Sequence, residues 1–212
     1  MVRFFALDFN IMAENIHPIF DSILNRKDKE KLLGQKAVVV WLTGLSGSGK
    51  STIAKGVEHK LYENGVMTKL LDGDNLRTGL NGNLGFSEED REENIRRVAE
   101  VAKLFASAGI VTLCSFVSPT VKIREQASHI IGNDFLEVYV KASFETCAER
   151  DVKGLYKKAL AGEIKNFTGL DAPFEEPEKP YLTIDTNIQS ADESVAVLYD
   201  SIIKLIRPNA HL

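Results

Sequence analysis

One nine-residue stretch constrains the fold more than any other part of this chain. Gly44-Leu45-Ser46-Gly47-Ser48-Gly49-Lys50-Ser51-Thr52 fits the pattern G-x-x-x-x-G-K-[ST] of a phosphate-binding loop. It lies between an apolar run at residues 38–43, typical of a buried strand, and residues 51–57, which open a helix. A glycine-rich turn that binds nothing is the alternative, and the complete motif between a strand and a helix disfavours it. We therefore expect a nucleoside triphosphate as ligand.

The chemistry of this loop assigns a role to each part. Backbone N–H groups and the helix N-terminus would surround anionic oxygens. Lys50 would reach the β- and γ-phosphates, and the Ser51 hydroxyl would ligate Mg²⁺. The residues expected to contact the triphosphate are Gly44, Ser46, Gly47, Ser48, Gly49, Lys50, Ser51 and Thr52.

The length and composition set limits on the class of protein. A chain of 212 residues suits one α/β domain, and a net charge of −4 without a dense basic block argues against nucleic acid as a partner. Cys114 and Cys147 have no metal-ligand spacing and are expected to be reduced core thiols. No signal peptide or long apolar run is visible, so we expect no membrane partner and a cytoplasmic location.

Strand-like and helix-like segments alternate along the chain. Strands are expected at residues 38–43, 66–71, 109–117, 135–140 and 181–185, with helices between them. This alternation predicts βαβ units and a three-layer α/β/α fold around a central parallel sheet, of the P-loop NTPase type. Residues 1–35 lack a clean period and are expected to form an N-terminal arm, and residues 36–212 the domain.

Two carboxylates follow the second strand directly, at Asp72 and Asp74. Ligands in such sheets lie beyond the carboxyl ends of the strands, so both would stand beside the phosphate-binding loop. There they could bind Mg²⁺ or orient an attacking hydroxyl. An Asp/Asn turn that caps the next helix is an equally good interpretation.

A helix from Ser87 to about residue 108 carries Arg91 and Asn94 on or beside its apolar stripe. An unpaired guanidinium there would be costly to desolvate. An anion in a cleft would explain Arg91, and a buried ion pair with a carboxylate is the structural alternative. The pairs Glu92/Arg96 and Glu93/Arg97 point away from the stripe and are expected to be a solvated surface.

Two later segments complete the candidate site. Ser118-Pro119 ends the third strand, with Ser118 as the expected N-cap of the following helix. Residues 150–177 are basic, contain three glycines and lack an apolar period, which suits a lid over phosphates. A charged surface hairpin is the alternative. Phe167 would either pin this lid or stack on a base.

The pattern as a whole favours a kinase for a small acceptor. The chain lacks both the N-K-x-D motif for guanine and the L-S-G-G-Q motif of transporter ATPases. Phosphoryl transfer needs mainly positioning and charge neutralisation, which Lys50, Mg²⁺ and lid cations would supply.

The chain resembles the adenylylsulfate kinases. The resemblance is carried by residues 44–52, 71–77, 83–97, 150–159 and 167–169, which read GLSGSGKST, LDGDNLR, NLGFSEEDREENIRR, RDVKGLYKKA and FTG. It implies transfer of the ATP γ-phosphoryl group to the 3′-hydroxyl of adenosine 5′-phosphosulfate (APS), giving 3′-phosphoadenosine 5′-phosphosulfate and ADP. A P-loop kinase for another small metabolite or nucleotide is the alternative enzyme, and a regulatory nucleotide-binding module is the non-enzymatic one.

The resemblance also implies residue roles. Asp74 would orient or deprotonate the hydroxyl, with Asp72 supporting it or the metal. Arg150 would contact ATP. Ser118 occupies a position associated with a phosphoserine form in this family, and we rank a binding role for it above a covalent one. The residues implied to hold the acceptor are Asp74, Arg77, Phe86, Arg91, Asn94, Val117, Ser118, Lys153 and Phe167.

The resemblance further implies a homodimer and a possible functional coupling to ATP sulfurylase. The chain departs from the usual family pattern at residues 120–123, just after Ser118-Pro119. Contacts made by those four residues are therefore not carried over.

Overall fold

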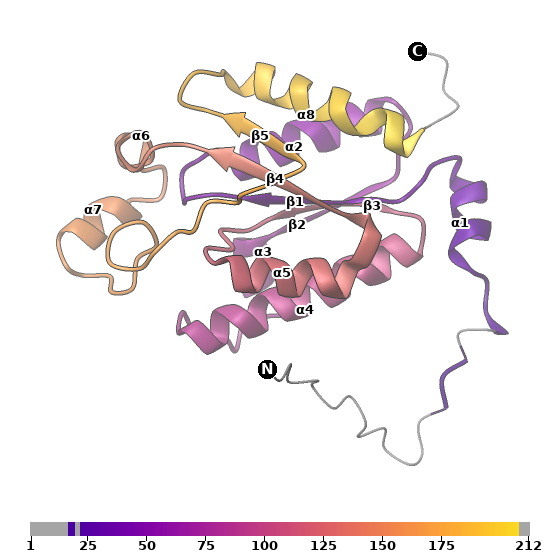
Figure 1. The fold of residues 1–212 in the computed structure, drawn as a ribbon, viewed down its shortest axis with the longest axis horizontal. Coiled ribbons are helices and arrows are strands. Elements are labelled where there is room, and N and C mark those ends of the chain that lie inside the picture. The colour runs from indigo at the N-terminus through magenta and orange to yellow at the C-terminus, as the bar shows by residue number, and fades with distance from the viewer. Residues whose placement is uncertain (1–16, 20–21, 208–212) are drawn as a thin grey trace, which may run out of the picture.

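The computed structural model describes residues 17–19 and 22–207. Five parallel strands form one sheet in the order β2-β3-β1-β4-β5, seen edge-on in the middle of Figure 1. The strands are β1 (Val39–Thr43), β2 (Thr68–Asp72), β3 (Val111–Ser115), β4 (Phe135–Lys141) and β5 (Leu182–Asp185). The predicted parallel α/β sheet is confirmed, and each strand falls inside or within one residue of its predicted range.

Helices cover both faces of this sheet (Figure 1). Helices α2 (Lys50–Glu63) and α8 (Ala191–Ile206) pack on one face, and α4 (Glu88–Ser107) and α5 (Val121–Ile131) on the other. The shorter helices are α1 (Arg26–Leu33), α3 (Gly73–Arg77), the 3₁₀ turn η2 (Gly132–Asp134), α6 (Phe144–Arg150) and α7 (Leu155–Leu160). The three-layer α/β/α architecture is therefore as predicted.

The core explains why β1 and β3 read as continuous apolar runs. Every residue of both strands is buried, because helices lie above and below them. Val40 and Leu42 face α2 and α8, while Val39 and Trp41 face α4 and α5. Cys114 and Cys147 are buried free thiols, as expected, and burial raises the pKa of each.

The end of the predicted arm packs on the domain. Gln35 is buried, and its amide bonds to Met67 N and O and to the Gly109 carbonyl at 2.8–2.9 Å. Arg26 in α1 forms an ion pair with Asp134 and donates to the Ala37 carbonyl at 2.7 Å. The arm at residues 1–35 stays a prediction, and most of its first half lies outside the described residues.

Helix starts test the capping predictions. Ser190 and Glu193 form a complete capping box at the start of α8. The Ser87 side chain caps α4 by accepting from Asp90 N. The Asp90 carboxylate accepts from Gly85 N and not from Ser87 N, so no capping box forms. The predicted cap of α5 is wrong, because that helix begins at Val121 after Thr120, and Ser118 lies outside it.

The charged surface of α4 is also paired differently from the prediction. Glu93 contacts both Arg96 and Arg97, so the Glu93/Arg97 pair is confirmed. Glu92 pairs with Lys122 of α5 and not with Arg96. Helical spacing could not reveal a partner on a neighbouring helix.

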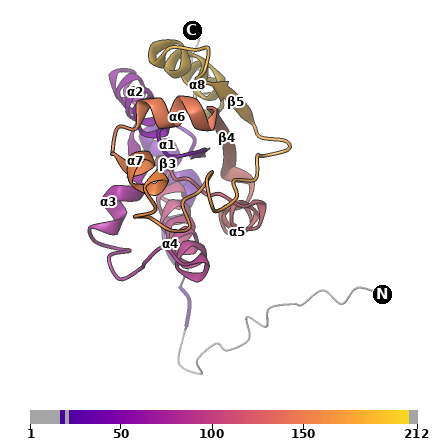
Figure 2. The same cartoon turned by 90° about the vertical axis from the view of Figure 1, so that its left-hand side faces the viewer.

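The predicted lid contributes to a small hydrophobic core, although its sequence has no apolar period. Tyr156, Ala159 and Phe167 are buried against Leu45, Ala142 and Cys147. Figure 2, which looks at this end of the molecule, shows α6 and α7 beside the sheet. In the part of the chain that the structure describes, no helix is long and apolar enough to cross a bilayer.

Candidate active site

A cavity of about 1130 Å³ opens at the carboxyl ends of the strands. It is lined by the phosphate-binding loop, the end of β2, the start of α4, the end of β3 and the lid. It brings together all of the residues predicted for the site except Gly44. An added Cβ on Gly44 would lie 2.4 Å from the Val140 carbonyl oxygen, so this glycine lets the loop leave β1 close against β4.

Lys50 is buried beneath the loop. Its Nζ donates to the carbonyls of Gly44 at 2.9 Å and Leu45 at 2.7 Å. Burial lowers its pKa to about 8, with Lys153 acting in the same direction, while Cys147, Asp72 and Asp74 oppose the shift. The ammonium is thus held beside the loop and would gain from a nearby anion.

Ser51 and Asp72 stand together at the start of α2. The Ser51 hydroxyl donates to Asp72 Oδ2 at 2.7 Å and lies 3.0 Å from Ser115 Oγ. The described residues contain no cluster of three or more His, Cys, Asp or Glu side chains that could hold a metal alone. Hydroxyl and carboxylate oxygens beside a phosphate site suit Mg²⁺, which binds few protein ligands and keeps phosphate and water ligands.

Asp72 and Asp74 differ in their roles. Asp72 is the N-cap of α3 and accepts from Asp74 N at 3.0 Å, so the capping interpretation holds for Asp72. The Asp74 carboxylate instead pairs with Lys153 of the lid. Both side chains of that pair are more than half exposed.

Arg77 and Arg91 approach the cavity from α3 and α4. The Arg77 guanidinium stacks over the Phe86 ring, 4.3 Å from its centroid, and donates to the carbonyls of Leu84 and Gly85. Phe86 itself is 66% exposed. Phe167, the other aromatic residue predicted to hold the acceptor, is only 9% exposed and packs on Tyr156.

Arg91 joins α4 to the lid. Its Nη1 donates to Thr168 Oγ1 at 2.9 Å, its Nη2 to the Asn166 carbonyl at 2.8 Å and its Nε to the Phe86 carbonyl at 3.0 Å. None of these acceptors is a carboxylate, so the predicted alternative of a buried ion pair is wrong. Burial lowers the pKa of Arg91, and neighbouring Arg77 adds to this effect.

Asn94 is buried one turn further along α4. Its Oδ1 accepts from Asn81 Nδ2 at 2.9 Å. Because this bond uses the carbonyl oxygen, the Asn94 amide N–H groups remain for the cavity that the residue lines.

Ser118 is buried in a backbone conformation that serine seldom adopts, with φ of 44°. Its hydroxyl accepts from Trp41 Nε1 at 3.0 Å, and its carbonyl accepts from Arg124 at 2.8 Å. Buried Arg124 also forms an ion pair with the partly buried Glu137. These contacts fix Val117 and Ser118 at the cavity wall and explain why Ser118 does not cap α5.

Arg150 and Lys153 flank the loop on the lid side. Arg150 donates to the Gly47 carbonyl at 3.3 Å and to Thr186 O at 2.6 Å. Both residues line the cavity.

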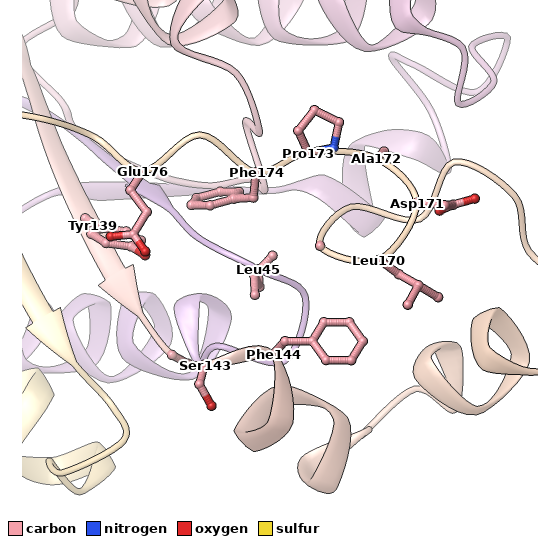
Figure 3. Close-up of a pocket in the computed structure, with 12 residues that line it drawn as sticks. Leu45, Tyr139, Ser143, Phe144, Leu170, Asp171, Ala172, Pro173, Phe174 and Glu176 are labelled. Carbon is pink, nitrogen blue, oxygen red and sulfur yellow. The ribbon is translucent and has the colours of Figure 1, made fainter.

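A second pocket of about 400 Å³ is lined by Leu45, by residues that follow β4 and by the end of the lid. Figure 3 shows Leu45 between the rings of Phe174 and Phe144, with Tyr139 beside Glu176. None of the predicted polar site residues lines this pocket.

Sequence reasoning missed several residues that the structure brings to the site. Tyr156, Asn166, Thr168 and Thr186 line the cavity and bond to site residues or to the loop. Tyr156 and Thr168 lie within quoted motif blocks, and this is the only sequence signal that marked them. Arg124 and Glu137 show no signal, because they are far apart in the sequence.

Comparison with known proteins places this geometry in a family. The family model described as adenylylsulphate kinase matches residues 36–185. An adenylyl-sulfate kinase from Phocaeicola vulgatus is 57% identical over 194 residues, which cover 91% of this chain and 95% of the relative. Another from Bacteroides fragilis is 57% identical over 190 residues, covering 89% and 94%.

A solved structure agrees with these relatives. The APS kinase CysC of Mycobacterium tuberculosis, in complex with AMPPNP and APS, is 46% identical, with a TM-score of 0.76. The match covers 79% of this chain and 98% of that one. On its sequence, fold and site, the chain belongs to the adenylylsulphate kinase family.

Proposed function

We propose that this protein transfers the γ-phosphoryl group of ATP to the 3′-hydroxyl of APS, giving 3′-phosphoadenosine 5′-phosphosulfate and ADP, as a step of sulfate assimilation. One observation carries the proposal: a single cavity joins the phosphate-binding loop, with Lys50 and Ser51, to a second half containing Asp74, Arg91 and Phe167. Two anionic nucleotides can therefore meet at one point.

The donor half suits a triphosphate. Lys50, Arg150 and the loop N–H groups supply positive charge where the β- and γ-oxygens would lie. We infer that Mg²⁺ accompanies ATP, because the Ser51 hydroxyl and the Asp72 carboxylate are hard oxygen ligands at that point. When bound, Mg²⁺ would neutralise charge on the phosphate oxygens.

The acceptor half suits an adenine nucleotide with an anionic tail. Phe86 and Phe167 offer aromatic faces for the base, and Arg77, Arg91 and the Asn94 amide offer donors for the phosphosulfate. Val117 and Ser118 form the wall behind the ribose. We assign Ser118 to binding rather than to a covalent step, because its buried hydroxyl is already bonded to Trp41.

Asp74 would act on the attacking hydroxyl. Its carboxylate is unburied and faces Lys153, so an incoming ribose hydroxyl would take over a hydrogen-bond position at this oxygen. The carboxylate would align the hydroxyl with the phosphorus atom and accept its proton as the bond forms. Lys153 would then be free to contact the nucleotides as the lid closes.

We also propose a cytoplasmic location, a homodimer and functional coupling to ATP sulfurylase. The family resemblance is what supports these three proposals. The oligomeric state can be measured by light scattering.

A coupled assay of ADP release tests the reaction. With ATP, Mg²⁺ and APS the protein should turn over, while AMP, shikimate and gluconate as acceptors should give only background. Activity with a control acceptor alone would overturn the proposed substrate. Absence of activity with all four would favour a regulatory nucleotide-binding module.

A further inference from the structure

Tyr156 of α7 touches both halves of the cavity. Its side chain is 2% exposed. Its hydroxyl donates to the Ser46 carbonyl in the phosphate-binding loop at 2.7 Å. Its ring meets the Phe167 ring edge to face, with centroids 4.9 Å apart and an interplanar angle of 80°. One rigid side chain therefore connects the donor loop to the aromatic wall of the acceptor half.

The hydrogen bond to Ser46 controls the direction of a phosphate-facing group. The Ser46 carbonyl and the Gly47 N–H belong to the same planar trans peptide and point in opposite directions. With the carbonyl fixed toward Tyr156, the Gly47 N–H points to the other side of that peptide. A triphosphate bonded to this N–H would in turn hold the Ser46 carbonyl against the Tyr156 hydroxyl.

The ring of Tyr156 is fixed on its other sides. Phe144 packs against it at 5.2 Å with an angle of 67°, and Asp151 accepts from its backbone N at 3.0 Å. Phe167 is held in turn by Asp171, whose carboxylate accepts from its backbone N. A shift of Tyr156 would therefore move the Phe167 ring rather than be absorbed by a loose neighbour.

We propose that Tyr156 is a positioning residue that couples binding of the donor nucleotide to binding of the acceptor. Triphosphate on the loop fixes the Ser46–Gly47 peptide, this peptide fixes Tyr156, and Tyr156 holds Phe167 in place for the acceptor base. Such coupling is reciprocal, so the acceptor strengthens donor binding by the same factor. The inference rests on the proposed function, since it takes APS as the acceptor.

Titration calorimetry with the Tyr156→Phe variant tests this coupling. The Kd for APS is measured with and without a saturating non-hydrolysable ATP analogue and Mg²⁺, and the ratio of the two values is the coupling factor. The variant keeps the ring and loses the hydroxyl group that donates to Ser46. Its coupling factor should fall about 2- to 10-fold, the range expected for one hydrogen bond, while the Kd for APS alone stays within about twofold.

Tyr181→Phe is the matched control. The Tyr181 hydroxyl donates to the Ser201 carbonyl at the same 2.7 Å, and Tyr181 does not line the cavity. This variant should keep the wild-type coupling factor. In steady-state assays at saturating ATP, Tyr156→Phe should raise KM for APS more than it lowers kcat.

A coupling factor of one in the wild type would overturn the proposal, and so would equal factors in the wild type and Tyr156→Phe. A loss in Tyr181→Phe as large as that in Tyr156→Phe would also overturn it. Failure of the wild type to bind APS in either state would instead refute the proposed function, so the two failures are distinguishable.

Discussion

Asp74 is the residue on which the proposed chemistry depends. Asp74→Asn keeps the size of the side chain but removes the charge that would orient and accept the proton of the hydroxyl. We expect kcat to fall by roughly 10²-fold or more, the scale of general-base contributions. Steady-state kinetics would measure this, with Asp200→Asn, an exposed position on α8, as the control. Near-normal turnover of Asp74→Asn would reject the role.

Lys50 should give ATP binding a distinctive dependence on pH. Its pKa is lowered to about 8 in the ligand-free protein, so near that pH about half of the molecules carry a neutral amine. A bound triphosphate favours the charged ammonium and raises this pKa, so binding takes up protons at pH 8 and above. Near pH 6 the amine is already protonated, and almost no uptake is expected.

Calorimetry in buffers of different ionisation enthalpy measures this uptake. Binding near pH 8 should take up about half a proton more than binding near pH 6, as follows from the lowered pKa. Lys55→Met, which alters an exposed lysine on α2, should leave the difference unchanged. Equal uptake at both pH values would contradict the assignment to Lys50.

At the scale of elements, Arg91 ties α4 to the lid. Arg91→Lys keeps the charge but cannot reach Phe86 O, Asn166 O and Thr168 Oγ1 together, because lysine lacks the planar fork. We expect KM for APS to rise by about 10-fold or more, from the loss of charge-assisted bonds, with ATP affinity within about twofold. Arg96→Lys, on the exposed face of α4, is the control. Equal effects of both variants would contradict a specific role.

Elements with a strong period were predictable, and the contacts between them were not. Strands β1 and β3 and the apolar stripe of α4 follow directly from the sequence, because burial imposes their patterns. The small hydrophobic core of the lid could not be predicted from apolar periodicity. Tyr156 and Phe167 have no periodic partners nearby, and they pack on Leu45 and Cys147 from distant segments.

The same reason explains the errors at Ser118 and Glu92. Ser118-Pro119 has the composition of a helix start, but Trp41 and Arg124 hold the serine in a conformation incompatible with that cap. Glu92 of α4 forms an ion pair with Lys122 of the neighbouring helix α5. Residue types in motifs thus predicted which side chains line the site, while their hydrogen-bond partners depended on the tertiary fold.

At the scale of the whole molecule, strand order determines which segments meet. The order β2-β3-β1-β4-β5 sets β1 and its loop between β3 and β4. Asp72 and Ser118 therefore stand on one side of the loop, and the lid starts after β4 and α6 on the other side and reaches across to Asp74 and Arg91. The parallel sheet was predicted from the alternation of segments, whereas this order was not, since no local pattern encodes which strands are neighbours.

The domain boundary leads to a prediction for two truncations. Removal of residues 1–35 eliminates the Arg26 ion pair and the buried Gln35 amide, whereas removal of residues 1–24 leaves both. The longer truncation should lower the free energy of unfolding by about 2–5 kcal/mol. That corresponds to a fall in Tm of roughly 5–15 °C, and the shorter one should change Tm little. Thermal unfolding distinguishes them, and equal Tm values would contradict packing of residues 25–35 on the domain.

The contact between Lys153 and Asp74 has a consequence for the protein when no acceptor is bound. Because the Asp74 carboxylate is paired with Lys153, we expect it to activate a water molecule less well than an unpaired carboxylate would, which would limit hydrolysis of ATP without an acceptor. Because both side chains are exposed, the contact is weak enough for an arriving sugar hydroxyl to displace it. Through Lys153 the lid would therefore limit transfer of the ATP phosphoryl group to water until the acceptor binds.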